Sequence, residues 1–183
     1  MIQKFVPTPI ILMFFLSVLN TQFRSQTKTP QMKYVTVEGY LTSSSQYCGG
    51  MPPSEEEERE LHTPKAYYTK LYIRKGNKNS TKKPILDSTV TDSKGHFKFM
   101  LPPGEYVIIM PYQKDKKILS TLHKLKSKDI KVNNLCLKYW WKGGLFKVSV
   151  RDSSIKGLDY NFHNRCFVPY PFPCISYYGP YPS

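Results

Sequence analysis

The stretch "TDSKGHFKFMLPPGEYVIIM", residues 91–110, carries the clearest structural pattern of the chain. Residues 92–95 have the composition of a tight turn, and Gly95 can adopt the positive φ that such a turn requires. Residues 96–101 place Phe97, Phe99 and Leu101 on one side and His96, Lys98 and Met100 on the other, which is the period of a strand with one buried face. Residues 102–104, Pro-Pro-Gly, then force a tight corner.

A second apolar run follows the corner and resumes the inward face. Alternate positions of a strand share one side, so the apolar residues before and after the corner face the same core. That face is formed by Phe97, Phe99, Leu101, Tyr106, Ile108 and Met110. The stretch therefore predicts a β-hairpin with a single apolar side, which is a scaffold.

Comparable patterns elsewhere predict a mainly β fold. Two helices are expected: one at residues 54–62, where Ser54 and Glu57 have capping-box spacing, and an amphipathic, cationic one at 115–126 that packs against the sheet. Further strands are predicted at residues 33–41, 68–75, 85–91, 136–141, 145–150 and 157–162. Together these elements predict a Greek-key β-sandwich of about seven strands with two short inserted helices.

The N-terminus has the pattern of a secretory signal peptide. Lys4 supplies a positive charge, and residues 10–19 form an apolar run that is too short to span a bilayer. We therefore expect a signal peptide at residues 1–25 and a flexible N-terminus at 26–32. This pattern predicts export to the periplasm, the cell surface or the extracellular space, with no later membrane-spanning segment.

The chain is basic. Removing Lys4 and Arg24 from its 27 basic residues leaves 25 against 13 acidic ones, a net charge of +12. Most lysines are scattered, as on solvated surfaces, and only the region between Lys114 and Lys131 is dense. Electrostatic adhesion of that region to anionic lipid or polysaccharide is one hypothesis. Nucleic acid is not an expected partner, because the chain has no recognisable binding motif.

The chain has four cysteines, and an even number in an exported domain favours two disulfides. No CxxC pair or close Cys/His spacing supports a metal site. Four cysteines allow three pairings, and the sequence does not choose among them. Our expectation is Cys136 with Cys166 and Cys48 with Cys174.

The order of the quoted patterns resembles a known family. "VTVEGYLT" near the start, residues 91–110 in the middle and "FKVSVRDSSIKGLDYNFH" near the end resemble the carboxypeptidase regulatory-like domain of the prealbumin-like (transthyretin-like) sandwiches. The resemblance implies a prealbumin-like β-sandwich, which we place at residues 33–165, with a Pro/Tyr-rich, disulfide-tied tail at 166–183. Such domains accompany catalytic or transport domains and carry no catalytic residues.

Two further segments are similar to a subgroup of exported bacterial proteins of unassigned function. These are the insert "YCGGMPPSEE" and the ending that contains "KYWW" and the last cysteines. The similarity implies a bacterial cell-envelope setting.

The sequence contains no catalytic motif, and we expect neither an enzyme nor a cofactor. The four histidines lie far apart and form no HExxH pattern. Carboxylates near a histidine can bind a hard cation. A metal-binding protein or a metal-dependent hydrolase is therefore an alternative, and its weak candidate ligands are His62, His163, Glu57 and Glu58.

Aromatic side chains form the candidate binding surface, because their faces suit sugar rings and peptides. They are Trp140, Trp141, Tyr170, Tyr177 and Tyr178. If Trp140 and Trp141 lie in a strand, they face opposite ways and one belongs to the core. The leading hypothesis is a non-enzymatic exported β-sandwich with a binding or structural role at the cell envelope. Its contact surface would be the insert after Cys48 together with the tail, and its partner an envelope protein or glycan.

Overall fold

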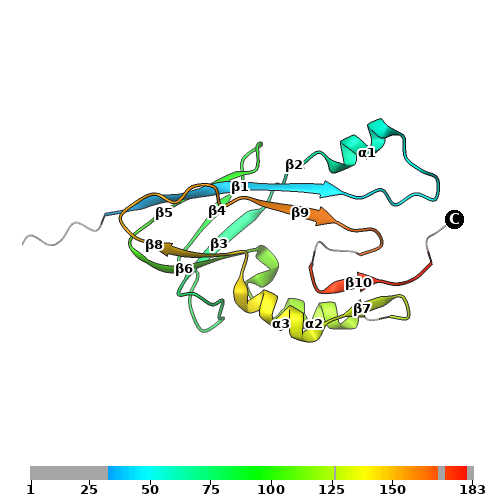
Figure 1. Cartoon of the computed structure of the whole chain (residues 1–183). Helices are drawn as coiled ribbons and strands as arrows, with labels where there is room; N and C mark the ends of the chain where they lie inside the picture. The colour runs from blue at the N-terminus through cyan, green and yellow to red at the C-terminus, as the bar shows by residue number, and fades with distance from the viewer. Residues whose placement is uncertain (1–32, 126, 169–171, 181–183) are drawn as a thin grey trace, which may run out of the picture. The chain divides into compact units, whose positions relative to one another are not determined.

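The computed structural model describes residues 33–125, 127–168 and 172–180 of the 183-residue chain (Figure 1). The expected signal peptide at 1–25, the N-terminal segment at 26–32 and Tyr170 lie outside the described residues. The described part is mainly β, with two four-stranded sheets, a two-stranded sheet and three α-helices. None of its helices is long and apolar enough to cross a membrane.

The first sheet is built around β1 (Val35–Ser45). Its first half pairs antiparallel with β5 (His96–Leu101), and its second half pairs with β2 (Lys65–Ala66) on one edge. On the other edge it runs parallel to β9 (Tyr160–Asn164), so the two strands end on the same side of the sheet.

The second sheet is antiparallel throughout. Its order is β4 (Asp87–Val90), β3 (Lys70–Lys75), β6 (Gly104–Ile109) and β8 (Phe146–Val150). These strands confirm the sequence predictions for residues 68–75, 85–91 and 145–150. The prealbumin-like Greek-key connection of the strands remains a prediction.

The predicted hairpin of residues 91–110 is wrong in its pairing. β5 pairs with β1 in the first sheet, whereas β6 pairs with β3 and β8 in the second. The corner at 102–104 therefore carries the chain from one sheet to the other, and the Tyr106 hydroxyl donates a hydrogen bond to the Pro102 oxygen across it, at 2.9 Å. A hairpin and a sheet-to-sheet corner both place alternate residues toward one core, so the pattern alone does not separate them.

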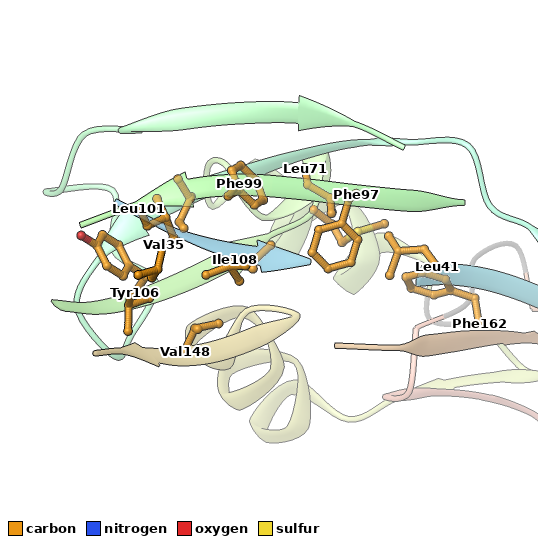
Figure 2. Packing of buried hydrophobic residues seen from close by; sticks show 14 residues of the cluster. Val35, Leu41, Leu71, Phe97, Phe99, Leu101, Tyr106, Ile108, Val148 and Phe162 are labelled. Atoms are coloured by element: carbon orange, nitrogen blue, oxygen red, sulfur yellow. The ribbon is translucent and has the colours of Figure 1, made fainter. Parts of the chain in front are cut away.

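The core between the two sheets contains the residues that the alternation selected. Phe97, Phe99 and Leu101 come from one sheet, and Tyr106 and Ile108 come from the other; all five are at most 4 % exposed. Figure 2 shows these side chains filling the space between the strands, together with Val35, Leu41, Leu71, Val148 and Phe162. The buried face of residues 97–110 was thus predicted correctly even though the pairing was not.

Two helices form where they were predicted, although the second packs against α3 (Asn134–Gly143) and the C-terminal segment rather than against a main sheet. α1 (Glu55–His62) begins at Ser54, whose hydroxyl oxygen accepts from the Glu57 N–H while the Glu57 carboxylate accepts from the Ser54 N–H. None of its residues is buried. α2 (Lys117–Lys124) follows a short 3₁₀ turn, η1 (Pro111–Gln113). Its buried Leu122 packs in a second apolar cluster outside the core of the two main sheets.

The strand predicted at residues 136–141 is wrong, because this segment is the helix α3 (Asn134–Gly143). The side chain of Asn133 accepts from the Cys136 N–H at 3.0 Å and so caps the helix start. Leu137 and Trp141, four residues apart, then fall on one buried face. The prediction read the aromatic run as a strand and overlooked the capping asparagine before it.

The C-terminal segment adds a small sheet that the sequence did not predict. β7 (Ile130–Val132) pairs antiparallel with β10 (Ile175–Tyr177). Ile175 and Phe172 are buried in the second apolar cluster with α2 and α3. Figure 1 shows β7, β10, α2 and α3 grouped together beside the two main sheets.

The structure contains two disulfides, as expected, but the expected pairing is wrong. Cys48 is bonded to Cys166, and Cys136 is bonded to Cys174. The first bond follows from the parallel pairing of β1 and β9, because the two cysteines lie just beyond the ends of these adjacent strands. The second ties the first turn of α3 to the start of β10, where the Asn133 N–H also donates to the Cys174 oxygen.

Candidate ligand-binding pocket

A pocket of about 560 Å³ lies between α2, α3 and the loop that follows β3. Its apolar floor is formed by Leu119 of α2 and by Leu137 and Trp141 of α3. Leu137 and Trp141 are one helical turn apart, so α3 presents both to the same side. Small-molecule sites are commonly of 300–1,000 Å³ and mostly apolar, and this pocket fits both criteria.

The rim of the pocket is cationic. Lys138 and Lys142 are four residues apart on α3, Lys116 precedes α2, and Lys82 comes from the loop. Among the residues that the structure describes, no aspartate or glutamate lines the pocket. Within the described part of the chain, none of the four lysines forms an ion pair with a carboxylate. The Lys116 ammonium lies 5.8 Å from the centre of the Trp141 ring, over the pocket floor.

Hydrogen bonds hold the walls of the pocket in place. The Asn79 side-chain amide donates to the backbone oxygens of Gln113 (2.8 Å) and Trp141 (3.0 Å). Its backbone N–H donates to the backbone oxygen of Lys142 (2.8 Å). The Trp141 indole N–H donates to the backbone oxygen of Asp115 at 2.8 Å. The loop, the start of α2 and the end of α3 are therefore fixed to one another before any ligand arrives.

A buried guanidinium lies directly behind the pocket wall. Arg74 on β3 is 5 % exposed; it donates to the Asn79 side-chain oxygen at 2.5 Å and to the Lys114 oxygen at 2.7 Å. Its Nε has no hydrogen-bond partner among the described residues. Burial lowers the pKa of Arg74 from its ordinary value, but a guanidinium stays charged at neutral pH. Arg74 therefore adds positive potential to a pocket that is already cationic.

The candidate aromatic residues occupy different environments. Trp141 is 3 % exposed and lines the pocket, whereas Trp140 packs against the rings of Tyr112 and Phe172. Tyr177 lies against Phe167, with 4.9 Å between ring centres. Tyr178 is 64 % exposed, and the Lys131 ammonium lies 4.4 Å from its ring centre. Because α3 is a helix, the argument that adjacent tryptophans face opposite ways does not apply.

The weak metal-ligand candidates are not brought together into a site. The Glu57 carboxylate accepts from the Ser54 N–H and hydroxyl, both at 2.8 Å, and these bonds lower its pKa. Glu58 and His62 are exposed on α1, and the His163 Nδ1 lies 3.3 Å from the Ser44 hydroxyl. No group of three or more His, Cys, Asp or Glu residues in the described segments could hold a metal ion.

The sequence analysis identified only part of the pocket. Trp141 was a candidate binding residue, and Lys116 lies in the dense basic region between Lys114 and Lys131. The pocket also contains residues that were not candidates, among them Lys82, Leu119, Leu137, Lys138 and Lys142. On α3 the signal was the four-residue spacing of Leu137 with Trp141 and of Lys138 with Lys142, which is visible only if the segment is read as a helix. Lys82 lies in a loop and has no such signal.

Comparisons with known proteins leave the family open. No family model and no curated protein matches the chain. Among solved structures it is similar to the shaft pilin spaA from Lactobacillus rhamnosus GG, with 9 % identity over 73 % of this chain and a TM-score of 0.34. A point mutant of that pilin gives a TM-score of 0.38, and the Bacillus anthracis TIE protein gives 13 % identity over 72 % of this chain and a TM-score of 0.31.

The chain spans about half the length of the pilin chains and 17 % of the TIE protein chain. With TM-scores this low, these similarities carry no conclusion about function.

Proposed function

We propose that this protein is a non-enzymatic, exported β-sandwich module that binds another component of the bacterial cell envelope. The two disulfides support export, because such bonds persist in oxidising compartments and are rare in the cytosol. The proposed recognition site is the pocket between α2 and α3. In this proposal the two main sheets act as the scaffold, and the elements added beside them provide the contact surface.

The observation that carries the proposal is the preformed pocket itself. Its floor is apolar, its rim carries convergent polar groups, and hydrogen bonds from Asn79 and Trp141 hold its walls. The disulfide between Cys136 and Cys174 holds the start of α3. A ligand therefore meets a rigid site and loses little affinity to ordering it.

A pair of variants on α2 tests this proposal. Ser120 lines the pocket, so Ser120→Phe places a ring in the cavity, whereas its exposed neighbour Thr121 does not line it and Thr121→Phe serves as the matched control. The immobilised chain 26–183 is exposed to an envelope extract, and the retained molecules are identified by mass spectrometry of the protein, glycan and lipid fractions.

We expect one identified component to be retained by the unaltered protein and by Thr121→Phe, and lost from Ser120→Phe. The melting temperatures of the two variants verify that both fold. Equal retention by all three proteins would contradict the proposal, because it would place the contact outside the pocket.

A further inference from the structure

We infer that the occupant of this pocket is a small amphipathic anion, with an apolar chain or ring and a single anionic head group. This inference rests on the proposed function and names the ligand class of the same site. It follows from three features of the pocket: the chemistry of its floor, the charge of its rim and its concave shape.

The floor selects an apolar body. Leu119, Leu137 and Trp141 present only hydrocarbon and ring surface to the cavity, apart from the indole N–H of Trp141, which is already bonded to the Asp115 oxygen. The methylene stems of the rim lysines extend this apolar surface toward the opening. A ligand without an apolar part would leave the floor uncovered and would gain nothing from it.

The rim selects an anion. Four lysines line the cavity, the Arg74 guanidinium lies behind the wall, and none of the 13 acidic residues, all of which the structure describes, lines it. Like charges that line one cavity repel one another, and an anionic group placed among them relieves that repulsion. The Ser80 side chain also lines the cavity; its oxygen accepts from the Lys82 N–H, and its hydroxyl can donate to an anionic oxygen.

The combination of an apolar floor and a cationic rim favours a small amphipathic anion over a polyanion. A polysaccharide or a membrane surface is held by exposed lysines alone and needs no cavity. Here the lysines line an apolar hollow of about 560 Å³, which has room for one chain or ring rather than for a polymer. A carboxylate and a phosphate monoester share the required head-group chemistry, and the experiment distinguishes them.

The test is a calorimetric titration of the chain 26–183 with hexanoate, octanoate and decanoate. Octyl phosphate supplies the second anionic head group, and octanol and octyltrimethylammonium supply an uncharged and a cationic one. We expect the affinity to rise roughly fourfold with each added methylene, as burial of apolar surface requires. Octanol should bind about tenfold more weakly than octanoate, because it lacks the charge-assisted hydrogen bonds to the lysines. The cation should not bind.

Two triple variants locate the effect. Lys116→Gln/Lys138→Gln/Lys142→Gln removes three rim charges, and Lys75→Gln/Lys98→Gln/Lys147→Gln removes three exposed charges elsewhere on the strands. We expect the rim variant to lose octanoate affinity about tenfold or more and the control variant to retain it. An equal loss in both would mean attraction by net charge alone and would overturn the inference.

The remaining outcomes separate this inference from the proposed function. If no alkyl anion binds, or if octanol binds as tightly as octanoate, the ligand class is wrong. The proposed function would survive that result if Ser120→Phe still abolished retention of an identified envelope component. If octanoate binds Ser120→Phe as tightly as Thr121→Phe, octanoate does not bind in the pocket and the inference is wrong.

Discussion

The side-chain amide of Asn79 donates a hydrogen bond to the backbone oxygen of Trp141, 62 positions later in the chain, at 3.0 Å. The same side chain accepts from Arg74 through its oxygen. One buried amide therefore joins a cation on β3, the loop beside the pocket and the end of α3. The pocket wall and the second main sheet share this connection.

Replacing Asn79 with Ala should lower the free energy of unfolding by about 2–4 kcal/mol. The change leaves the buried Arg74 without one acceptor and the oxygens of Gln113 and Trp141 without a donor, and unsatisfied buried groups are costly. Urea denaturation measures the effect. Asn77→Ala, at an exposed position of the same loop, should change stability by less than about 0.5 kcal/mol. An equally small effect at Asn79 would show that the network does not stabilise the fold.

Replacing Cys136 and Cys174 with Ser should lower the free energy of unfolding by about 4 kcal/mol, from the chain entropy of a loop of 38 residues. The same change at Cys48 and Cys166, which close a loop of 118, should cost about 5 kcal/mol. Non-reducing peptide mapping checks the bonds themselves. Recovery of a peptide that links Cys136 to Cys166 would refute the pairing described above.

Replacing Gly95 with Ala should destabilise the protein by more than about 2 kcal/mol. Gly95 has a φ of +79°, and a left-handed conformation alone costs a residue with a Cβ about 1–2 kcal/mol. An added Cβ would also clash with the backbone oxygen of Leu41. Gly143, in the last turn of α3, is the matched control, since a Cβ there meets nothing within 4 Å. Gly143→Ala should be neutral or stabilising by up to about 1 kcal/mol. Thermal denaturation of both variants makes the comparison.

The stability of the protein should fall as the pH rises above about 10. Burial raises the pKa of Tyr112 above its ordinary value, so above this pH the folded state keeps a proton that the unfolded chain loses. The stabilisation is therefore fully present below the unfolded pKa, and it decreases above it by up to about 1.4 kcal/mol per pH unit. Tyr112→Phe should make this decrease shallower in denaturation curves measured from pH 9 to 11. The exposed Tyr139→Phe is the control, and an identical change in both variants would remove Tyr112 as the cause.

The sequence predicted the parts of this fold that depend on local pattern. Alternation located the core face of β5 and β6, and capping-box spacing located α1. Pairing depends on the distant partner, so the corner at 102–104 was taken for a hairpin, and the cysteines were matched without knowledge that β1 and β9 run parallel. The pocket was missed for a related reason. Its lysines converge only when α2, α3 and the Asn79 loop are assembled.

The bond between Cys48 and Cys166 determines how tension would pass through the molecule. A pull on the two ends of the chain would run along β1 to Cys48, cross the sulfur bridge to Cys166 and leave through the tail. Residues 49–165 form a covalent loop closed by this bridge, and the load reaches them only from the side. β1 transmits force in shear to β5 and β9, and the tail transmits it to β7 through β10 and to α3 through the bond between Cys136 and Cys174. The second main sheet is therefore mechanically shielded by one covalent bond.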